Sequence, residues 1–109
     1  MSNSDIVSGT LDLLILKTLS EGPLHGYGIA KRIRSASADV LRIGDNVLYP
    51  ALHRLADRGE LSGRWGTTDS GREARIYRLT RKGRTRLDRE SARWRERSEA
   101  ALRILGGDA

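Results

Sequence analysis

The chain has 109 residues, no cysteine and a formal net charge of +6 at pH 7. The length fits a single domain, and the lack of cysteine excludes disulfides, thiolate metal sites and cysteine nucleophiles. Seventeen of the twenty cationic side chains are Arg, which suits contact with phosphate and guanine. A polyanionic partner is one interpretation, and an Arg-rich soluble surface without such a partner is the other.

Neither end of the chain predicts membrane insertion or export. The longest apolar run, residues 13–16, is far too short to cross a bilayer. The polar start of the chain does not resemble a signal peptide. We therefore expect a cytoplasmic protein without membrane contact.

A leucine-rich segment predicts a first helix over residues 10–21, ended by Gly22 and Pro23. Most of its apolar residues follow helical spacing on one face, whereas Leu13 and Leu16 lie on the other side. A helix that is apolar on both sides needs two surfaces to cover it. A second copy of the chain is one way to cover Leu13 and Leu16.

Two further helices are predicted before residue 60. An amphipathic pattern after Tyr27 indicates the second. In the third, Leu48, Leu52 and Leu55 recur on one face and should point into the core. Pro50 is tolerated in the first turn of a helix, so this helix should begin near residue 46 or 47, and Gly59 should end it.

The second half of the chain predicts a hairpin followed by one long helix. Apolar residues on either side of the Gly-rich stretch 66–71 indicate two strands. Thr80 is a good N-cap for a helix over residues 81–105, which contains no proline. The fold class is therefore mainly α with a small β-hairpin.

Three short helices followed by a hairpin are typical of a winged helix-turn-helix, in which the third helix enters the major groove of DNA. The expected domain boundaries are residues 9–80 for the winged helix and 81–105 for a C-terminal dimerisation helix, with tails at 1–8 and 106–109. Winged helices also occur as protein interaction modules.

Four motifs in order resemble the PadR-like family of transcriptional regulators. They are GTLDLLIL at 9–16, GPLHGY at 22–27, LYPALHRL at 48–55 and YRLT at 77–80, with Gly83. The resemblance implies a dimeric repressor-type regulator of the short form, with the third helix and the wing on DNA and the last helix forming the dimer. The chain departs from the family at residues 45–47 (DNV), where Gly, Ser or Thr is common, so operator preference is not transferred.

Candidate DNA-binding residues come from the start of the second helix, the third helix and the hairpin: His25, Gly26, Tyr27, Asn46, Tyr49, Pro50, His53, Arg54, Arg72 and Arg75. The start of the second helix suits a phosphate, but His25 as a helix cap and Tyr27 as a core aromatic are equally open. Asn46 is expected either to read adenine or to cap its helix. Arg72 and Arg75 are expected on the DNA backbone or in the minor groove.

A narrow stripe along the last helix predicts packing against a partner helix. This stripe consists of Leu87, Ser91, Trp94, Ser98, Ala101 and Leu105, and with Leu13 and Leu16 it is the expected dimer interface. Small residues beside Trp94 leave two interpretations: plain dimer packing, or a pocket for a flat aromatic effector.

No catalytic site is expected, because the two histidines have no nucleophile or metal-ligand spacing around them. We also expect no metal and no cofactor. The predicted function is a sequence-specific regulator, with double-stranded DNA and a second copy of the chain as partners and a roughly palindromic operator. The competing hypotheses are an interaction module, which Arg54 and Arg58 against Asp57 disfavour, and an architectural DNA binder.

Overall fold

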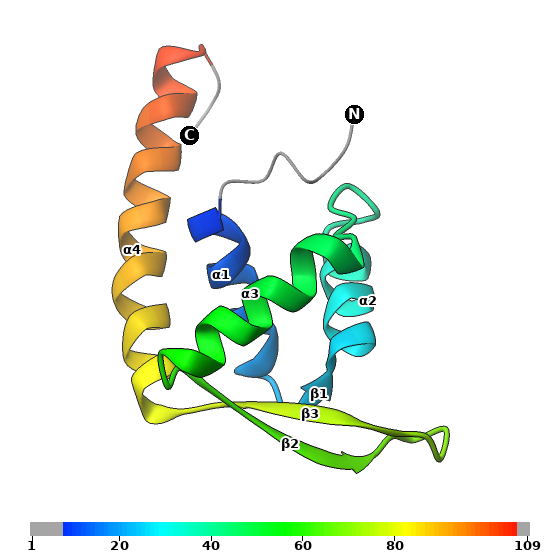
Figure 1. Ribbon diagram of the computed structural model, residues 1–109. Helices are drawn as coiled ribbons and strands as arrows, with labels where there is room; N and C mark the ends of the chain where they lie inside the picture. Colours follow the sequence, from blue (N-terminus) through cyan, green and yellow to red (C-terminus); the bar gives the residue numbers. More distant parts are fainter. Residues whose placement is uncertain (1–7, 107–109) are drawn as a thin grey trace.

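Four helices and three strands follow one another along residues 8–106, the part of the chain that the computed structural model describes. Their order is α1 (Ser8–Leu19), β1 (Leu24–His25), α2 (Gly26–Ala36), α3 (Asp45–Asp57), β2 (Leu61–Thr67), β3 (Glu73–Leu79) and α4 (Arg81–Ile104). α1, α2 and α3 lie on one side of the sheet, and α4 runs along α1 and extends past it (Figure 1). The predicted fold class, mainly helical with a winged hairpin and a long last helix, is confirmed.

The sheet is antiparallel with the strand order β1-β3-β2. β1 was not expected, because two residues carry no periodicity of their own. It forms where Leu24 and His25 pair with Tyr77 and Ile76 of β3. This pairing places the start of α2 next to the hairpin.

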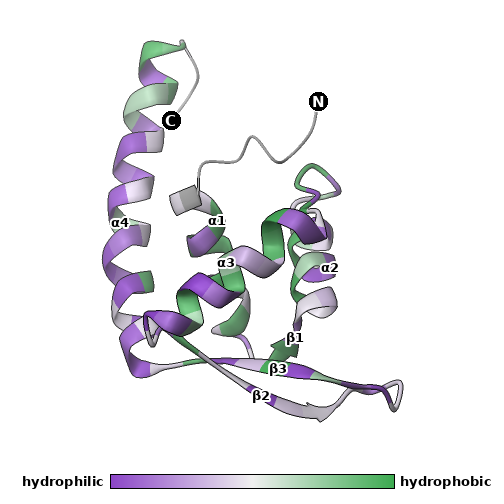
Figure 2. Cartoon of the chain, in the orientation of Figure 1, coloured by the Kyte–Doolittle hydropathy of each residue, from purple (hydrophilic) through white to green (hydrophobic). Residues whose placement is uncertain are grey.

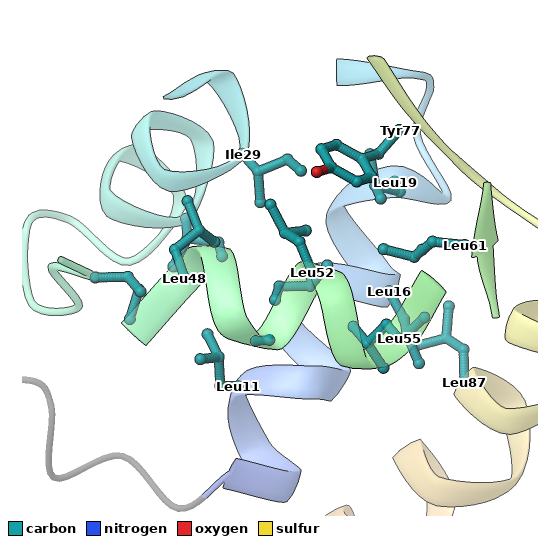
Figure 3. Packing of buried hydrophobic residues seen from close by; sticks show 14 residues of the cluster. Leu11, Leu16, Leu19, Ile29, Leu48, Leu52, Leu55, Leu61, Tyr77 and Leu87 are labelled. Atoms are coloured by element: carbon teal, nitrogen blue, oxygen red, sulfur yellow. The ribbon is translucent and has the colours of Figure 1, made fainter. Parts of the chain in front are cut away.

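The core lies between the three short helices and the base of the sheet (Figure 3). Leu48, Leu52 and Leu55 are fully buried, so the predicted core face of α3 is confirmed. Leu16 is also fully buried, and Leu87 of α4 is 5% exposed. Both had been expected at a dimer interface, and this is wrong, because each side chain packs inside its own chain.

α4 is attached to the body at its first turn. Thr80 caps the helix by accepting a hydrogen bond from the Gly83 amide at 3.1 Å, as predicted, and its hydroxyl donates to the carbonyl of Gly59 at 2.7 Å. A Cβ at position 83 would collide with the carbonyl oxygen of Glu60. Gly83 is therefore required for the close approach of α4 to the start of β2. Beyond this region α4 is hydrophilic along most of its length (Figure 2).

The third helix begins earlier than predicted, at Asp45, with Gly44 as the N-cap and no side-chain cap hydrogen bond. Capping by Asn46 is therefore wrong, and Asn46 is exposed. The amides of Val47 and Leu48 bond to the Gly44 carbonyl at 3.0 and 2.9 Å, which adds a turn before Pro50. Pro50 thus lies in the second turn, on the exposed side, where water can solvate the carbonyl that it leaves without a partner.

Candidate nucleic-acid interface

A groove of about 540 Å³ separates the start of α2 and the exposed side of α3 from the hairpin. Six of the ten candidate DNA-binding residues line it: His25, Gly26, Tyr27, Tyr49, Arg72 and Arg75. Lys31 and Tyr77 line it as well, together with the acidic Asp69 and Glu73. Sheet pairing of β1 with β3 brings these residues together although they lie in segments distant in the sequence.

The start of α2 forms one wall of this groove. His25 is the N-cap, and its Nδ1 accepts a hydrogen bond from the Gly28 amide at 3.2 Å, which confirms the capping interpretation. Tyr27 is 69% exposed, so the alternative of a core aromatic is wrong. The Tyr27 ring meets the His25 ring edge-on, with centroids 6.2 Å apart. A helix start of this kind carries a partial positive charge and favours anions.

Tyr49 occupies the junction between α2 and α3. Its ring packs on the backbone of Gly26, where a Cβ would lie 2.7 Å from the Tyr49 Cε1 atom. Glycine at position 26 therefore lets the ring approach, while 39% of Tyr49 stays exposed. His53 and Pro50 are exposed on the same helix but do not line the groove.

Arg54 points back into the protein. Its Nη2 donates to Oδ1 of Asp12 at 2.7 Å, and the Asp12 side chain is only 4% exposed. A buried carboxylate needs a cationic or hydrogen-bonding partner, and α3 supplies one. One nitrogen of the Arg54 guanidinium is therefore engaged inside the protein, while 38% of the side chain stays exposed, so its contact with DNA stays a prediction.

Arg86 of α4 completes a buried ionic cluster with Asp12, Glu60 and Glu90. It donates to these three carboxylates at 3.2, 2.6 and 2.8 Å, and its side chain is 12% exposed. Burial opposes its charge, but the hydrogen bonds to Glu90 and Glu60 outweigh this and raise the pKa of Arg86 above its ordinary value. The hydrogen bond from Arg86 also lowers the pKa of Glu90. Together with the Arg54–Asp12 pair, the cluster links α1, α3, α4 and the turn before β2.

The hairpin carries exposed arginines, as predicted. Arg72 lies in the turn, where Gly71 has a φ of +83° and the Thr68 amide donates to the Arg72 carbonyl at 2.8 Å. Arg75 lies on β3, and its guanidinium carbon is 5.7 Å from the ring centroid of Trp65. Trp65 is one of the apolar residues beside the Gly-rich stretch that indicated the two strands, and nothing in the sequence separates an exposed strand aromatic from a buried one.

The stripe on α4 is exposed toward its end. Trp94 is 48% exposed, and its Nε1 donates to the Thr10 hydroxyl at 3.3 Å. Ser91 and Ser98 are half-buried, whereas Ala101 and Leu105 are exposed. The exposed apolar residues Leu102 and Ile104 were missed because they lie off the stripe. Of the predicted partners on α1, Leu13 stays partly accessible.

A cavity of about 170 Å³ lies beside Trp94. It is lined by Gly9, Thr10, Leu13, Arg86, Glu90, Arg93, Trp94 and Arg97.

Within residues 8–106, no helix is long and apolar enough to cross a membrane. The same part of the chain contains no group of three or more His, Cys, Asp or Glu side chains that could hold a metal ion.

A helical trio with a two-stranded wing and a groove between them defines a winged helix-turn-helix protein. The chain belongs to the transcriptional regulator PadR-like family, which matches residues 15–89. The transcriptional regulator Rv3488 of Mycobacterium tuberculosis is 33% identical over 97 residues, which are 89% of this chain and 84% of that relative.

Solved structures agree with this assignment. A transcriptional regulator from Clostridium thermocellum superimposes with a TM-score of 0.82 at 27% identity, covering 94% of this chain and 96% of that one. Bacillus subtilis PadR in complex with operator DNA is 28% identical, with a TM-score of 0.64 over 72% of this chain and 44% of that chain.

Proposed function

We propose that this protein is a sequence-specific DNA-binding transcriptional regulator, acting in the cytoplasm as a homodimeric repressor on a roughly palindromic operator. The observation that carries the proposal is the groove in which the start of α2, Tyr49 and the hairpin arginines face one another. The start of α2 offers a helix dipole for phosphate, Tyr49 is a ring on the helix that would enter the major groove, and Arg72 and Arg75 are two cations on the wing. The solved complex of Bacillus subtilis PadR with operator DNA supports the same partner.

The homodimer rests on the exposed end of α4. Ile104 and Leu105 are 86% and 81% exposed, and Trp94 and Leu102 are exposed as well. The α4 helix of a second copy would cover these side chains. The rest of α4 is polar, so we expect the dimer contact at this end of the helix. Two copies then present two α3 helices to half-sites about 34–36 Å apart along the DNA.

Selection of bound sites from random-sequence duplexes with the purified protein tests the proposal. A single palindromic motif with half-sites one helical turn apart is the expected result. Recovery of no DNA would favour a protein interaction module, and recovery without any sequence motif would favour an architectural binder. Repression itself is tested by placing the selected motif over a promoter and measuring transcription with and without the protein.

Tyr49→Phe is the sharpest single variant for this surface, because it keeps the ring on Gly26 and removes only the hydroxyl. If the hydroxyl contacts a base or a phosphate, we expect a loss of about 1–3 kcal/mol in operator binding. A loss on the operator alone assigns a base, and an equal loss on random DNA assigns a phosphate. The change leaves the buried leucines of α3 in place, so the fold should be retained.

We also propose that the cavity beside Trp94 takes a flat aromatic effector. It is an open hollow of about 170 Å³, in which the indole of Trp94 and the side chain of Leu13 lie among the charged side chains of Arg86, Glu90, Arg93 and Arg97. A second chain seated on α4 would close it further. A compound that quenches Trp94 fluorescence and also releases operator DNA supports this role, whereas compounds that do neither leave plain dimer packing as the function of Trp94.

A further inference from the structure

Trp65 is a large side chain at the outer part of the wing, 72% exposed. The strand register pairs Leu61 with Leu79, Gly63 with Tyr77 and Trp65 with Arg75. Directly opposed residues of antiparallel strands share a face. Because Leu61 and Tyr77 on that row are buried, Trp65 lies on the face that turns toward the helices, beyond the end of the core.

The Trp65 ring has a partner within the wing. The Arg75 guanidinium carbon lies 5.7 Å from its centroid, a distance at which cation and ring attract. The Arg75 side chain crosses Gly63, where a Cβ would lie 3.0 Å from Arg75 Cδ and 3.1 Å from Tyr77 Cε1. Gly63 therefore makes room for the two side chains that reach across it, and Trp65 and Arg75 form one stacked unit.

This unit adjoins the groove that Arg72, Arg75 and Tyr77 line. The hairpin from residue 64 to residue 75 carries three arginines against the carboxylates of Asp69 and Glu73. A flat ring with a cation on its face matches the sugar–phosphate edge of DNA, in which apolar deoxyribose carbons alternate with phosphates. Proteins place both apolar side chains and arginines against the minor groove.

We infer that Trp65 is a DNA-contact residue, which packs with Arg75 against deoxyribose and phosphate at the edge of the minor groove while α3 lies in the neighbouring major groove. This inference rests on the proposed function and extends it, because it adds an aromatic anchor to the charged wing. Rigid Trp and Arg side chains are the residue types that most often dominate binding energy at interfaces.

The first test is binding of wild type, Trp65→Ala and Trp65→Phe to the duplex recovered by random-sequence selection. Trp65→Ala should weaken binding about thirty-fold, the size typical of an interface anchor, and Trp65→Phe clearly less. Arg64→Ala is the matched control, since Arg64 is exposed on the same strand but pairs with Ile76 on the opposite face. Its loss should stay below about three-fold.

The second test separates contact from a structural effect on the wing. The chain has two tryptophans, so the full-length protein labelled with 5-fluorotryptophan should show two fluorine NMR signals, assigned with Trp65→Phe. Addition of the selected duplex should shift the Trp65 signal far more than the signal of Trp94, which lies on α4.

The outcomes distinguish this inference from the proposed function. Wild-type binding with unchanged affinity in Trp65→Ala and an unmoved Trp65 signal would overturn the inference and leave the regulator intact. An equal loss in Arg64→Ala and Trp65→Ala would place the opposite face of the wing on DNA and would also overturn it. Failure of wild type to bind any duplex would remove the proposed function itself.

Discussion

Replacing Arg86 with alanine should remove a large part of the free energy of unfolding. The arginine is the partner of Glu60, which is 6% exposed, and one of two partners of Asp12, which is 3% exposed. Breaking a buried ion pair from one side costs about 3–5 kcal/mol because a charge stays buried without its partner. The pair with Glu90 adds only about 0.3–0.5 kcal/mol, as other i,i+4 pairs do.

The expected loss is therefore about 3–5 kcal/mol, against a total stability of about 5–15 kcal/mol for a domain. At roughly 4 °C per kcal/mol in a chain of this size, the midpoint of thermal unfolding should fall by about 12–20 °C. Calorimetry or circular dichroism at one fixed protein concentration measures it, since dimerisation makes the midpoint concentration-dependent. Arg84→Ala, an exposed arginine on the same helix, should change stability by less than about 0.5 kcal/mol.

The double variant Arg86→Ala with Glu60→Gln tests the mechanism. If the cost comes from a buried charge without a partner, removing the charge of Glu60 should restore part of the lost stability. A double variant no more stable than Arg86→Ala, or an Arg86→Ala protein as stable as Arg84→Ala, would refute the argument from the buried cluster.

Three more predictions concern pH, salt and assembly. The hydrogen bond from Arg86 lowers the pKa of Glu90 in the folded chain. The stabilisation by the ionised Glu90 is therefore complete above the ordinary pKa of about 4.5 and is lost as the pH falls further. In urea unfolding from pH 7 to about 3, the difference in stability between wild type and Glu90→Gln should disappear at the acid end. Operator affinity should fall with salt at a log–log slope of about −0.9 per phosphate neutralised. Changing Arg72 and Arg75 to alanine should make this slope less steep. An unaltered slope would show that the hairpin does not contact the DNA backbone. Trp94→Ala should weaken the dimer in sedimentation experiments, and an unchanged dissociation constant would remove Trp94 from the interface.

Local patterns predicted most of the elements correctly. The spacing of Leu48, Leu52 and Leu55 identified the core face of α3, because neighbouring turns of a helix repeat at short sequence distance. Thr80 marked the start of α4, because a cap acts on an amide three residues away. The Gly-rich stretch marked the turn of the wing, because glycines favour turns through their own backbone conformation.

Errors arose where a side chain has a partner far away in the sequence. The ion pair of Arg54 with Asp12, 42 residues earlier, was not predicted. Leu16 and Leu87 were expected on a second chain, but the approach of α4 to α1 buries them in their own chain. Apolar periodicity predicts that one face of a helix is buried, but it does not predict whether the same chain or a second chain buries it.

By itself the sequence determined the winged helix architecture and the family, and it supplied a set of candidate DNA-binding residues, because helix spacing, caps, turns and family motifs are local properties of the chain. Only the tertiary structure decided which of those residues share a groove, which arginines stay outside and which turn inward. The physical reason is that a buried carboxylate such as Asp12 must be neutralised by whichever cation the fold brings near it. For Asp12 these cations are Arg54 of α3 and Arg86 of α4, both distant from it in the sequence.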